Sequence, residues 1–244
     1  WKSKAKRYEK RVKERWLQPD SSRMYLIREL QENPGSSVLD IGAGTGAWSV
    51  LIAKHAKSVT ALEPSTTMHE ILQAKTRENG IDNIKLIKGS WPETEIEPHD
   101  YTLASHSMYG VPGFEPFIRK MVSVTRKTCF LVLRVLFTDT IMSEASKEIL
   151  GQPYDGPCFQ IAYNALLQLG INPNVLMETG KPRRPWVSES LEQALNNIKN
   201  RLNVHETDNY DGFLLSLLIE NLVEKNGVWQ WPVGDRSALI YWNV

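Results

Sequence analysis

The stretch Val38–Gly46 constrains the fold more than any other part of this 244-residue chain. Its sequence, VLDIGAGTG, combines an apolar run, a carboxylate at Asp40 and the glycines Gly42, Gly44 and Gly46, directly before a helical pattern. Glycine-rich turns of this kind join a buried strand to a helix and let a ligand approach the backbone closely. The stretch therefore predicts the first strand–turn–helix unit of an open α/β sheet.

Short apolar runs alternate with helical patterns after this turn. We expect strands at 38–41, 58–62, 84–87, 101–105, 128–135, 175–178 and 237–243. We expect helices at 47–55, 67–79, 115–126, 139–150, 158–169, 188–202 and 210–224, with Thr67 and Glu70 spaced as a capping box. Strands that alternate with helices form βαβ units and a parallel sheet covered on both faces.

The chain is interpreted as a single domain, 1–244, with three parts. These are N-terminal lid helices at 1–30, a cofactor-binding core at 36–135 and a helical cap insertion at 181–226, before the last strand. The formal net charge is only +1, although Lys and Arg dominate residues 1–15. This balance gives no whole-protein field that would attract nucleic acid or a membrane.

The composition also argues against several classes of protein. The only two cysteines, Cys129 and Cys158, are too few for a disulfide framework or a zinc site, which favours a reducing compartment. No apolar stretch approaches the ~18–20 residues that span a bilayer. We expect a cytoplasmic protein with no metal ion and no membrane partner, and the sequence does not specify its oligomeric state.

The charge of Asp40 distinguishes two cofactors that the glycine pattern allows. Gly42-x-Gly44-x-x-Ala47 also fits the dinucleotide fingerprint. A nicotinamide cofactor would bring its pyrophosphate to the helix N-terminus, where Asp40 would repel it. S-adenosylmethionine carries an ammonium and a sulfonium, which the carboxylate attracts. We therefore expect this methyl donor, with Glu63 at the end of the second strand accepting hydrogen bonds from its ribose hydroxyls.

These residues resemble those of the class I S-adenosylmethionine-dependent methyltransferases over roughly residues 1–135. Asp40–Gly46 is similar to the family's first motif, whose glycine backbone approaches the methionine moiety. The resemblance implies an α/β fold of the Rossmann-like type: a doubly wound, seven-stranded, mostly parallel sheet with the last strand antiparallel. It also implies S-adenosyl-L-methionine as cofactor and S-adenosyl-L-homocysteine as product.

The resemblance also assigns contacts to the cofactor. It implies that Glu63 and Pro64 bind ribose, that Met68 packs on adenine, and that Gly89–Trp91 holds the adenine edge, with Trp91 able to stack on the ring. Many members carry an Asp in that segment, where this chain has Ser90. The full set of implied cofactor-binding residues is Tyr8, Asp40, Gly42, Ala43, Gly44, Gly46, Glu63, Pro64, Met68, Gly89, Ser90, Trp91, Ser105 and His106.

The N-terminus adds a second resemblance. Trp1-x-x-x-Ala5-x-x-Tyr8 is similar to a lid helix of many small-molecule members, whose tyrosine reaches the bound donor. Trp1, Ala5, Tyr8, Val12 and Trp16 recur at helical spacing. This pattern predicts an amphipathic helix with a basic outer face.

His106 and Tyr109 are the catalytic candidates. An imidazole titrates near neutrality, so His106 could accept a proton from an acceptor that arrives protonated. Arg134, at the end of the fifth strand, is a candidate ligand for an anionic substrate, and Trp186 for the mouth of a pocket. Structural alternatives stay open: His106 could be only a strand-end residue, and Arg134 only a surface charge.

Three functions remain open at this point. The first is methyl transfer to a small molecule, favoured by the lid pattern and the insertion. The second is an RNA or protein methyltransferase, favoured only by the basic residues 1–15. The third is a protein that binds the donor without chemistry. The segment SHSMYG, where some members have Asp/Asn-Pro-Pro-Tyr/Phe, argues against methylation of exocyclic amines of DNA bases or glutamine.

Overall fold

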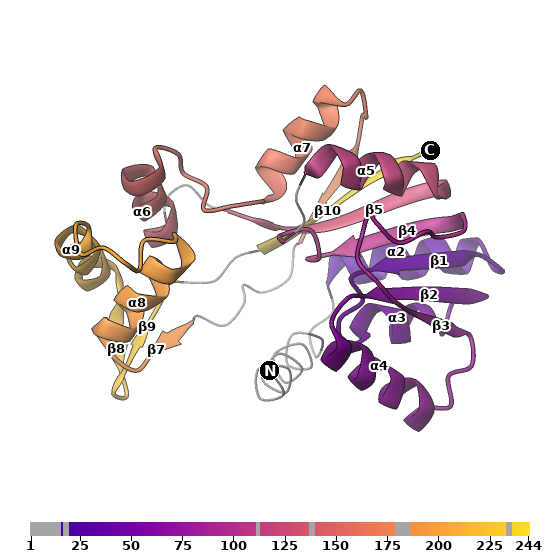
Figure 1. The fold of residues 1–244 in the computed structure, drawn as a ribbon, viewed down its shortest axis with the longest axis horizontal. Helices are drawn as coiled ribbons and strands as arrows, with labels where there is room; N and C mark the ends of the chain where they lie inside the picture. Colours follow the sequence, from indigo (N-terminus) through magenta and orange to yellow (C-terminus); the bar gives the residue numbers. More distant parts are fainter. Residues whose placement is uncertain (1–15, 17–19, 111–112, 137–139, 179–185, 233–235) are drawn as a thin grey trace. The chain divides into compact units, whose positions relative to one another are not determined.

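The chain divides into two compact units. The computed structural model describes residues 16, 20–110, 113–136, 140–178, 186–232 and 236–244, which are coloured in Figure 1. The first unit comprises Trp1–Leu133, Ile161–Gly180 and Ser237–Val244, and the second comprises Arg134–Gln160 and Lys181–Arg236. The sequence predicted a single domain with a cap, and the assignment of these parts to one domain stays a prediction.

The first unit is built on a seven-stranded sheet with the order β3-β2-β1-β4-β5-β10-β6. From β3 to β5 neighbouring strands are parallel, whereas β10 is antiparallel to β6. This confirms the predicted doubly wound, mostly parallel sheet with an antiparallel last strand. The strands are β1 (Ser37–Ile41), β2 (Ser58–Glu63), β3 (Ile84–Lys88), β4 (His99–Ser105), β5 (Thr125–Val135), β6 (Asn174–Met177) and β10 (Arg236–Asn243).

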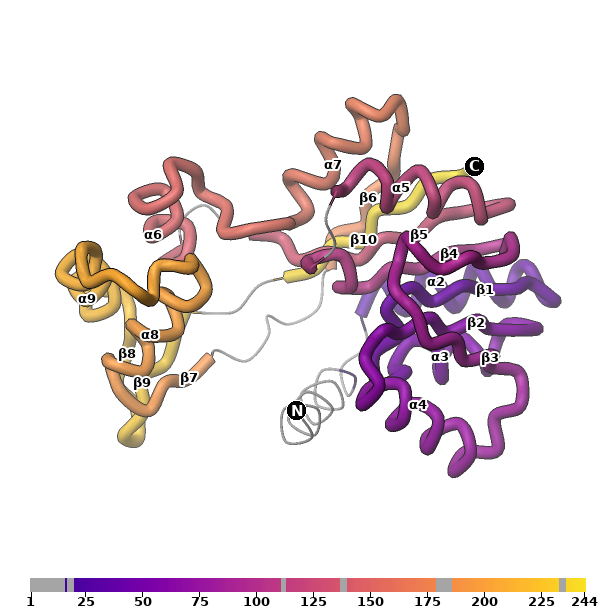
Figure 2. The backbone as a smooth tube through the Cα atoms, in the orientation of Figure 1, coloured from indigo at the N-terminus to yellow at the C-terminus, as the bar shows by residue number. Residues whose placement is uncertain are grey.

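Helices cover the strands of this sheet. Figure 2 shows α3 and α4 beside β2 and β3, and α5 and α7 beside β5, β6 and β10. A buried cluster joins Leu26, Leu30 and Ile52 to side chains of the strands, among them Val38 and Phe130. Each such fully buried side chain contributes about 1.5–3 kcal/mol of hydrophobic stabilisation. The helices are α2 (Ser21–Glu32), α3 (Ala47–Ile52), α4 (Thr66–Glu78), α5 (Phe114–Ser123) and α7 (Phe159–Gln168).

The predicted N-terminal lid is described only in part. Within it, α2 packs on the sheet, because Leu26 and Leu30 are 2% and 1% exposed. Asp20 caps this helix by accepting a hydrogen bond from Arg23 N at 2.7 Å. Tyr8 and the other residues of the predicted lid motif lie outside the described residues.

Several predicted boundaries are wrong. The N-cap of α4 is Ser65, whose hydroxyl accepts from Met68 N, so the capping box predicted for Thr67 and Glu70 does not form the helix start. α5 ends at Ser123 and β5 begins at Thr125, so the predicted helix is too long by a few residues. The Thr125 hydroxyl, which donates to Met121 O at 2.6 Å, satisfies a carbonyl at the helix end.

The second unit contains helices and a small antiparallel sheet. Its helices are α6 (Ile141–Leu150), α8 (Leu191–Arg201) and α9 (Asp211–Asn221), and its sheet has the order β7-β9-β8. The strands are β7 (Val187–Ser188), β8 (Val223–Lys225) and β9 (Val228–Gln230). Ala194, Ile198, Leu214, Leu218 and Trp231 belong to its buried core.

The predicted helical insertion is therefore a mixed structure. The β8–β9 hairpin turns at Asn226 and Gly227, which have φ of 55° and 75°. Two positive φ values are the requirement of a type I′ turn, for which Asn-Gly is the strongest sequence signal. The helix predicted to extend to 224 is therefore wrong at its C-terminal end, because β8 begins at Val223. Among the residues that the structure describes, no helix is both long enough and apolar enough to cross a membrane.

Candidate functional site

The turn after β1 is packed too closely for side chains. Gly46 has φ of 81°, and a Cβ there would collide with the Leu72 side chain. A Cβ at Gly42 would collide with Ser107, which follows β4. The glycines therefore bring the backbone of the turn against two neighbouring elements, as the sequence predicted for a ligand-binding turn.

Glu63 connects this turn to the end of β2. The amide of Ala43 donates to Leu62 O at 3.0 Å. The Gly44 amide donates to Glu63 Oε2 and the Ser65 amide to Glu63 Oε1, both at 2.8 Å. The buried Glu63 carboxylate thus holds two loops at the carboxyl edge of the sheet, where ligands bind in open α/β folds.

Asp40 lies beneath the turn and is 2% exposed. The Ser49 hydroxyl on α3 donates to Asp40 Oδ2 at 2.5 Å. Burial raises the pKa of Asp40 to about 6, and the charge of Glu63 adds to this rise while the Ser49 hydrogen bond opposes it. Among the described residues neither carboxylate has an ion-pair partner, so the two buried negative charges favour a cationic ligand.

Two buried hydroxyls at the turn without hydrogen-bond partners in the described structure bear on whether S-adenosylmethionine fits this site. Thr45 Oγ1 and Ser107 Oγ are buried and find no hydrogen-bond partner among the described residues. Buried polar groups in native proteins are normally paired, so an unpaired one calls for a ligand or water. A ligand with ammonium and hydroxyl groups would satisfy these oxygens and the two carboxylates, which fits this cofactor.

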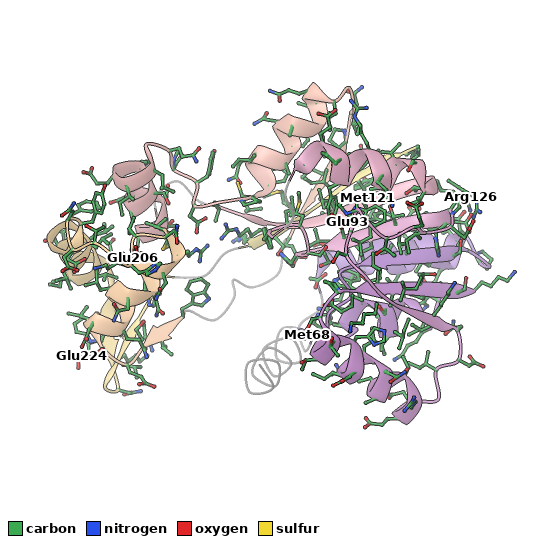
Figure 3. The ribbon with its side chains drawn as sticks, viewed as in Figure 1. Met68, Glu93, Met121, Arg126, Glu206 and Glu224 are labelled. Carbon is green, nitrogen blue, oxygen red and sulfur yellow. The ribbon has the colours of Figure 1, made fainter. Side chains whose placement is uncertain are left out.

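The segment after β3 is also held by β2. The amide of Gly89 donates to Glu63 O at 3.3 Å, and a Cβ at Gly89 would collide with Thr94. The Ser90 carbonyl accepts from Thr94 N at 2.9 Å and from Thr94 Oγ1 at 2.8 Å. Met68 lies at the start of α4 near the same edge, while Arg126 lies at the opposite edge (Figure 3). Their contacts with adenine stay predictions.

The structure gives the Trp91 side chain a packing role. Its indole is 5% exposed, donates to Phe117 O at 3.2 Å and meets the Phe117 ring edge-on at 6.1 Å. Because the ring is buried against α5, the stacking on adenine considered for Trp91 has no support in these contacts. A backbone contact from this residue to the cofactor stays a prediction.

Ser105 and His106 follow β4 at the same edge. The Trp48 indole of α3 donates to Ser105 Oγ at 2.8 Å, and Trp16 meets Trp48 edge-on at 5.4 Å. His106 adopts a left-handed backbone with φ of 54°, a conformation in which His is enriched several-fold. Its amide donates to Val132 O at 2.9 Å, which fixes the backbone of this turn.

The two catalytic candidates are in direct contact. His106 Nδ1 lies 2.8 Å from Tyr109 Oη, and the two rings are stacked at 6.0 Å. His106 Nε2 lies 3.2 Å from Ser237 Oγ at the start of β10. Ser237 was not predicted as a site residue. A signal existed, because the start of an antiparallel last strand lies at the carboxyl ends of its parallel neighbours.

Arg134 and Trp186 both belong to the second unit. Arg134 Nη2 pairs with Asp155 Oδ1 at 2.8 Å, and Arg201 pairs with the other oxygen of this carboxylate. The Arg201 guanidinium lies 5.3 Å from the centre of the Trp186 ring, which is 51% exposed. Asp155 thus connects the two predicted substrate residues, and no sequence signal marked Asp155 or Arg201. A substrate role for Arg134 and Trp186 stays a prediction.

Comparison with known proteins adds a family match over the region that holds the turn. Residues 38–128 match the family described as a methyltransferase domain. An uncharacterized protein of Haemophilus influenzae is 27% identical over 235 residues, covering 93% of this chain and 83% of that protein. The Saccharomyces cerevisiae dimethyladenosine transferase is 26% identical over 192 residues, 78% of this chain and 57% of its own.

A demethylmenaquinone methyltransferase of Listeria welshimeri is 27% identical over 109 residues, 43% of this chain and 46% of that protein. The chain thus spans about half the length of these two relatives, the transferase of Saccharomyces cerevisiae and the methyltransferase of Listeria welshimeri.

Solved structures share the fold. The YcgJ protein of Bacillus subtilis aligns with a TM-score of 0.61 at 12% identity, covering 91% of this chain and 97% of that one. Magnesium protoporphyrin IX methyltransferase of Synechocystis, solved with bound SAM, aligns with a TM-score of 0.51 at 12% identity, covering 91% and 76%. At such identities these structures show the fold alone.

Proposed function

We propose that this chain, a class I S-adenosylmethionine-dependent methyltransferase, transfers the methyl group of that cofactor to a small-molecule acceptor. The observation that carries the proposal is the pair of buried carboxylates, Asp40 and Glu63, with neutral hydrogen-bond donors beside the glycine turn. The turn also offers the unpaired hydroxyls of Thr45 and Ser107. A cation with further polar groups would pair with the two carboxylates and with the two hydroxyls.

The cofactor would be held by the carboxyl edge of the sheet. We assign the ribose to Glu63 and the methionine end to the glycine turn and Asp40, with Ser105 and His106 near the reacting end. When bound, S-adenosylmethionine supplies a methyl group on a sulfonium, so the acceptor atom bonds to that carbon while the carbon–sulfur bond breaks and sulfur keeps the electron pair. Positioning of the reactants can supply about 7–11 kcal/mol of the acceleration.

A small molecule is the acceptor that the charge balance favours. The formal net charge is +1, so the protein carries little of the excess positive charge that binds nucleic acid. The Listeria relative is named for demethylmenaquinone. We retain Arg134 and Trp186 as proposed substrate-binding residues. We also propose a cytoplasmic location, because two cysteines, Cys129 and Cys158, are too few for a disulfide framework.

Methylation of RNA is the second candidate. The Saccharomyces relative, named as a dimethyladenosine transferase, matches 78% of this chain. The sequence of residues 1–15 carries six more Lys and Arg than Glu, as eight basic residues minus Glu9 and Glu14. Phosphate contacts from such a segment would make binding strongly dependent on salt.

Calorimetric titration with S-adenosylmethionine, beside NAD, tests the cofactor. We expect donor binding in the wild type, weakening of at least about tenfold in Asp40→Asn, and no binding of NAD. Asp100→Asn is a matched control. Asp100 also accepts a hydrogen bond from a serine, Ser37 Oγ at 2.9 Å, but it lies near the amino end of β4, at the opposite end of the strands from the glycine turn. Binding of NAD without the donor would overturn the proposal.

Transfer of a radiolabelled methyl group into a fractionated cell extract identifies the acceptor class. We expect label in the low-molecular-mass fraction. Label in RNA that disappears on deletion of residues 1–15 would favour the second candidate. Tight donor binding with no label in any fraction would favour a protein that binds the donor without chemistry.

A further inference from the structure

We propose that Ser237 is a positioning residue that fixes the tautomer of His106, so that Tyr109 receives the acceptor's proton and relays it to His106. The proposal rests on the proposed methyltransferase function and extends it to residues that join β4 to β10. Ser237 is not among the site residues predicted from the sequence.

The geometry places the His106 ring between two hydroxyls. Nδ1 lies 2.8 Å from Tyr109 Oη and Nε2 lies 3.2 Å from Ser237 Oγ. The His106 backbone has φ of 54°, and its amide is fixed on Val132 O at 2.9 Å. Ring, phenol and serine therefore form one hydrogen-bonded chain within the first unit.

Ser237 is fixed independently of the histidine. It is 5% exposed, and its carbonyl accepts from Glu178 N at 3.1 Å. The Glu178 carboxylate in turn accepts from Ser22 Oγ of α2 at 2.8 Å. In addition, β10 lies between β5 and β6 in the sheet. A hydroxyl on such a strand offers the imidazole a stationary partner.

The phenol at Nδ1 and the acceptor oxygen of Ser237 at Nε2 together decide which nitrogen carries the proton, because an N–H without a partner is costlier than an acceptor nitrogen without one. A phenol has a pKa of about 10 and is a stronger acid, hence a better donor, than an aliphatic hydroxyl. The shorter distance is also the one to Tyr109. In neutral His106 we therefore assign Tyr109 O–H as donor to Nδ1, and Nε2–H as donor to Ser237 Oγ.

This tautomer sets the path of one proton. As the acceptor atom is methylated, its proton passes to Tyr109 Oη while the phenol proton passes to His106 Nδ1. Tyr109 ends neutral and His106 ends as an imidazolium with N–H groups directed at Tyr109 Oη and Ser237 Oγ. The extra proton then leaves His106 for water, which restores the starting state.

Nitrogen-15 NMR of the His106 ring tests the assignment directly. We expect wild-type protein above neutral pH to show a protonated Nε2 and an unprotonated, hydrogen-bonded Nδ1. Ser237→Ala should give a mixture of the two tautomers, and Ser237→Thr, which keeps the hydroxyl, should restore the wild-type signals. Tyr109→Phe should keep the proton on Nε2 and move only the Nδ1 signal.

The control variant is Ser36→Ala, because Ser36 is equally buried at 4% exposure but donates to Asn33 O beside β1. It should leave the His106 signals unchanged. A proton on Nδ1 in the wild type, or a tautomer that switches in Tyr109→Phe but not in Ser237→Ala, would overturn the proposal.

Donor binding by the same samples separates this proposal from the function on which it rests. We expect the Kd for S-adenosylmethionine in Ser237→Ala to stay within about twofold of the wild type. Absence of binding in the wild type would refute the proposed function. Normal binding together with the wrong tautomer would refute only the role of Ser237.

Discussion

The two units hold their buried acids in different ways. In the first unit Asp40 and Glu63 accept hydrogen bonds from a serine hydroxyl and from backbone amides. In the second unit Asp155, whose side chain is 1% exposed, lies between the guanidinium groups of Arg134 and Arg201. Neutral donors leave a net negative charge in place, whereas ion pairs cancel it.

This difference separates a binding role from a stabilising one. A carboxylate held by neutral donors is costly to bury, and a bound cation stabilises its ionised form. An acid held by two arginines has its countercharge in the fold, and removal of the acid would leave two partly buried cations together. We therefore expect substitution of Asp40 or Glu63 to affect chiefly the ligand, and substitution of Asp155 to affect chiefly stability.

The largest expected effect is that of Asp155→Asn. We expect a loss of about 3–4 kcal/mol in the free energy of unfolding, because Arg134 and Arg201 lose their shared counterion. Urea unfolding measures the loss, and hydrogen exchange should locate it in α8. Glu115→Gln is the control, since its pair with Arg119 is 2.6 Å long but exposed, and it should change stability by less than about 1 kcal/mol. Equal effects of the two variants would contradict the comparison.

A second prediction concerns the pH dependence of stability that Asp40 imposes. Its pKa rises from 3.8 to about 6 on folding, so the folded protein holds the proton more tightly than the unfolded chain. Stability from this proton is present below about pH 4 and is lost as the pH rises through 6, by up to about 3 kcal/mol. The difference between wild type and Asp40→Asn in urea unfolding from pH 4 to 7 measures it.

The same titration should appear in ligand binding. A cationic donor prefers the ionised carboxylate, so its affinity should fall as the pH drops below about 6 in the wild type but not in Asp40→Asn. A donor affinity that is independent of pH in both proteins would show that Asp40 does not face the ligand.

The smallest effects compare glycines with positive φ in the two units. Gly46→Ala should cost about 2 kcal/mol, because its φ is 81° and the new Cβ meets Leu72. Gly227→Ala has φ of 75° but open space around it, so we expect about 1 kcal/mol. Thermal unfolding measures both, and only Gly46→Ala should also weaken donor binding. Equal costs would show that Leu72 moves aside.

The sequence predicted the parts of the fold that depend on local pattern. The glycine turn, Glu63 and the seven strands of the main sheet followed from spacing and from the resemblance. The partners of the site residues did not, because Ser49 reaches Asp40 and Ser237 reaches His106 through packing between separate elements. The packing of Trp91 was unpredictable for the same reason, since only α5 in place shows that the indole is covered.

The second unit was predicted less well than the first, for two different reasons. Its hairpin had a local signal at Asn226 and Gly227, which an extended helix prediction masked. Its division from the first unit had no local signal, because it joins two stretches on either side of α7. Charge pairs such as that of Asp155 with Arg201 join residues 46 positions apart, and no local pattern marks which charged residues will pair.

The position of β10 has a consequence for synthesis on the ribosome. This strand ends the described chain, yet it lies inside the sheet between β5 and β6. While translation is under way, β5 therefore has an unpaired edge, which is a template for association with other chains. We expect nascent chains that stop before residue 236 to need chaperones, and proteases that remove the last strand to inactivate the protein rather than trim it.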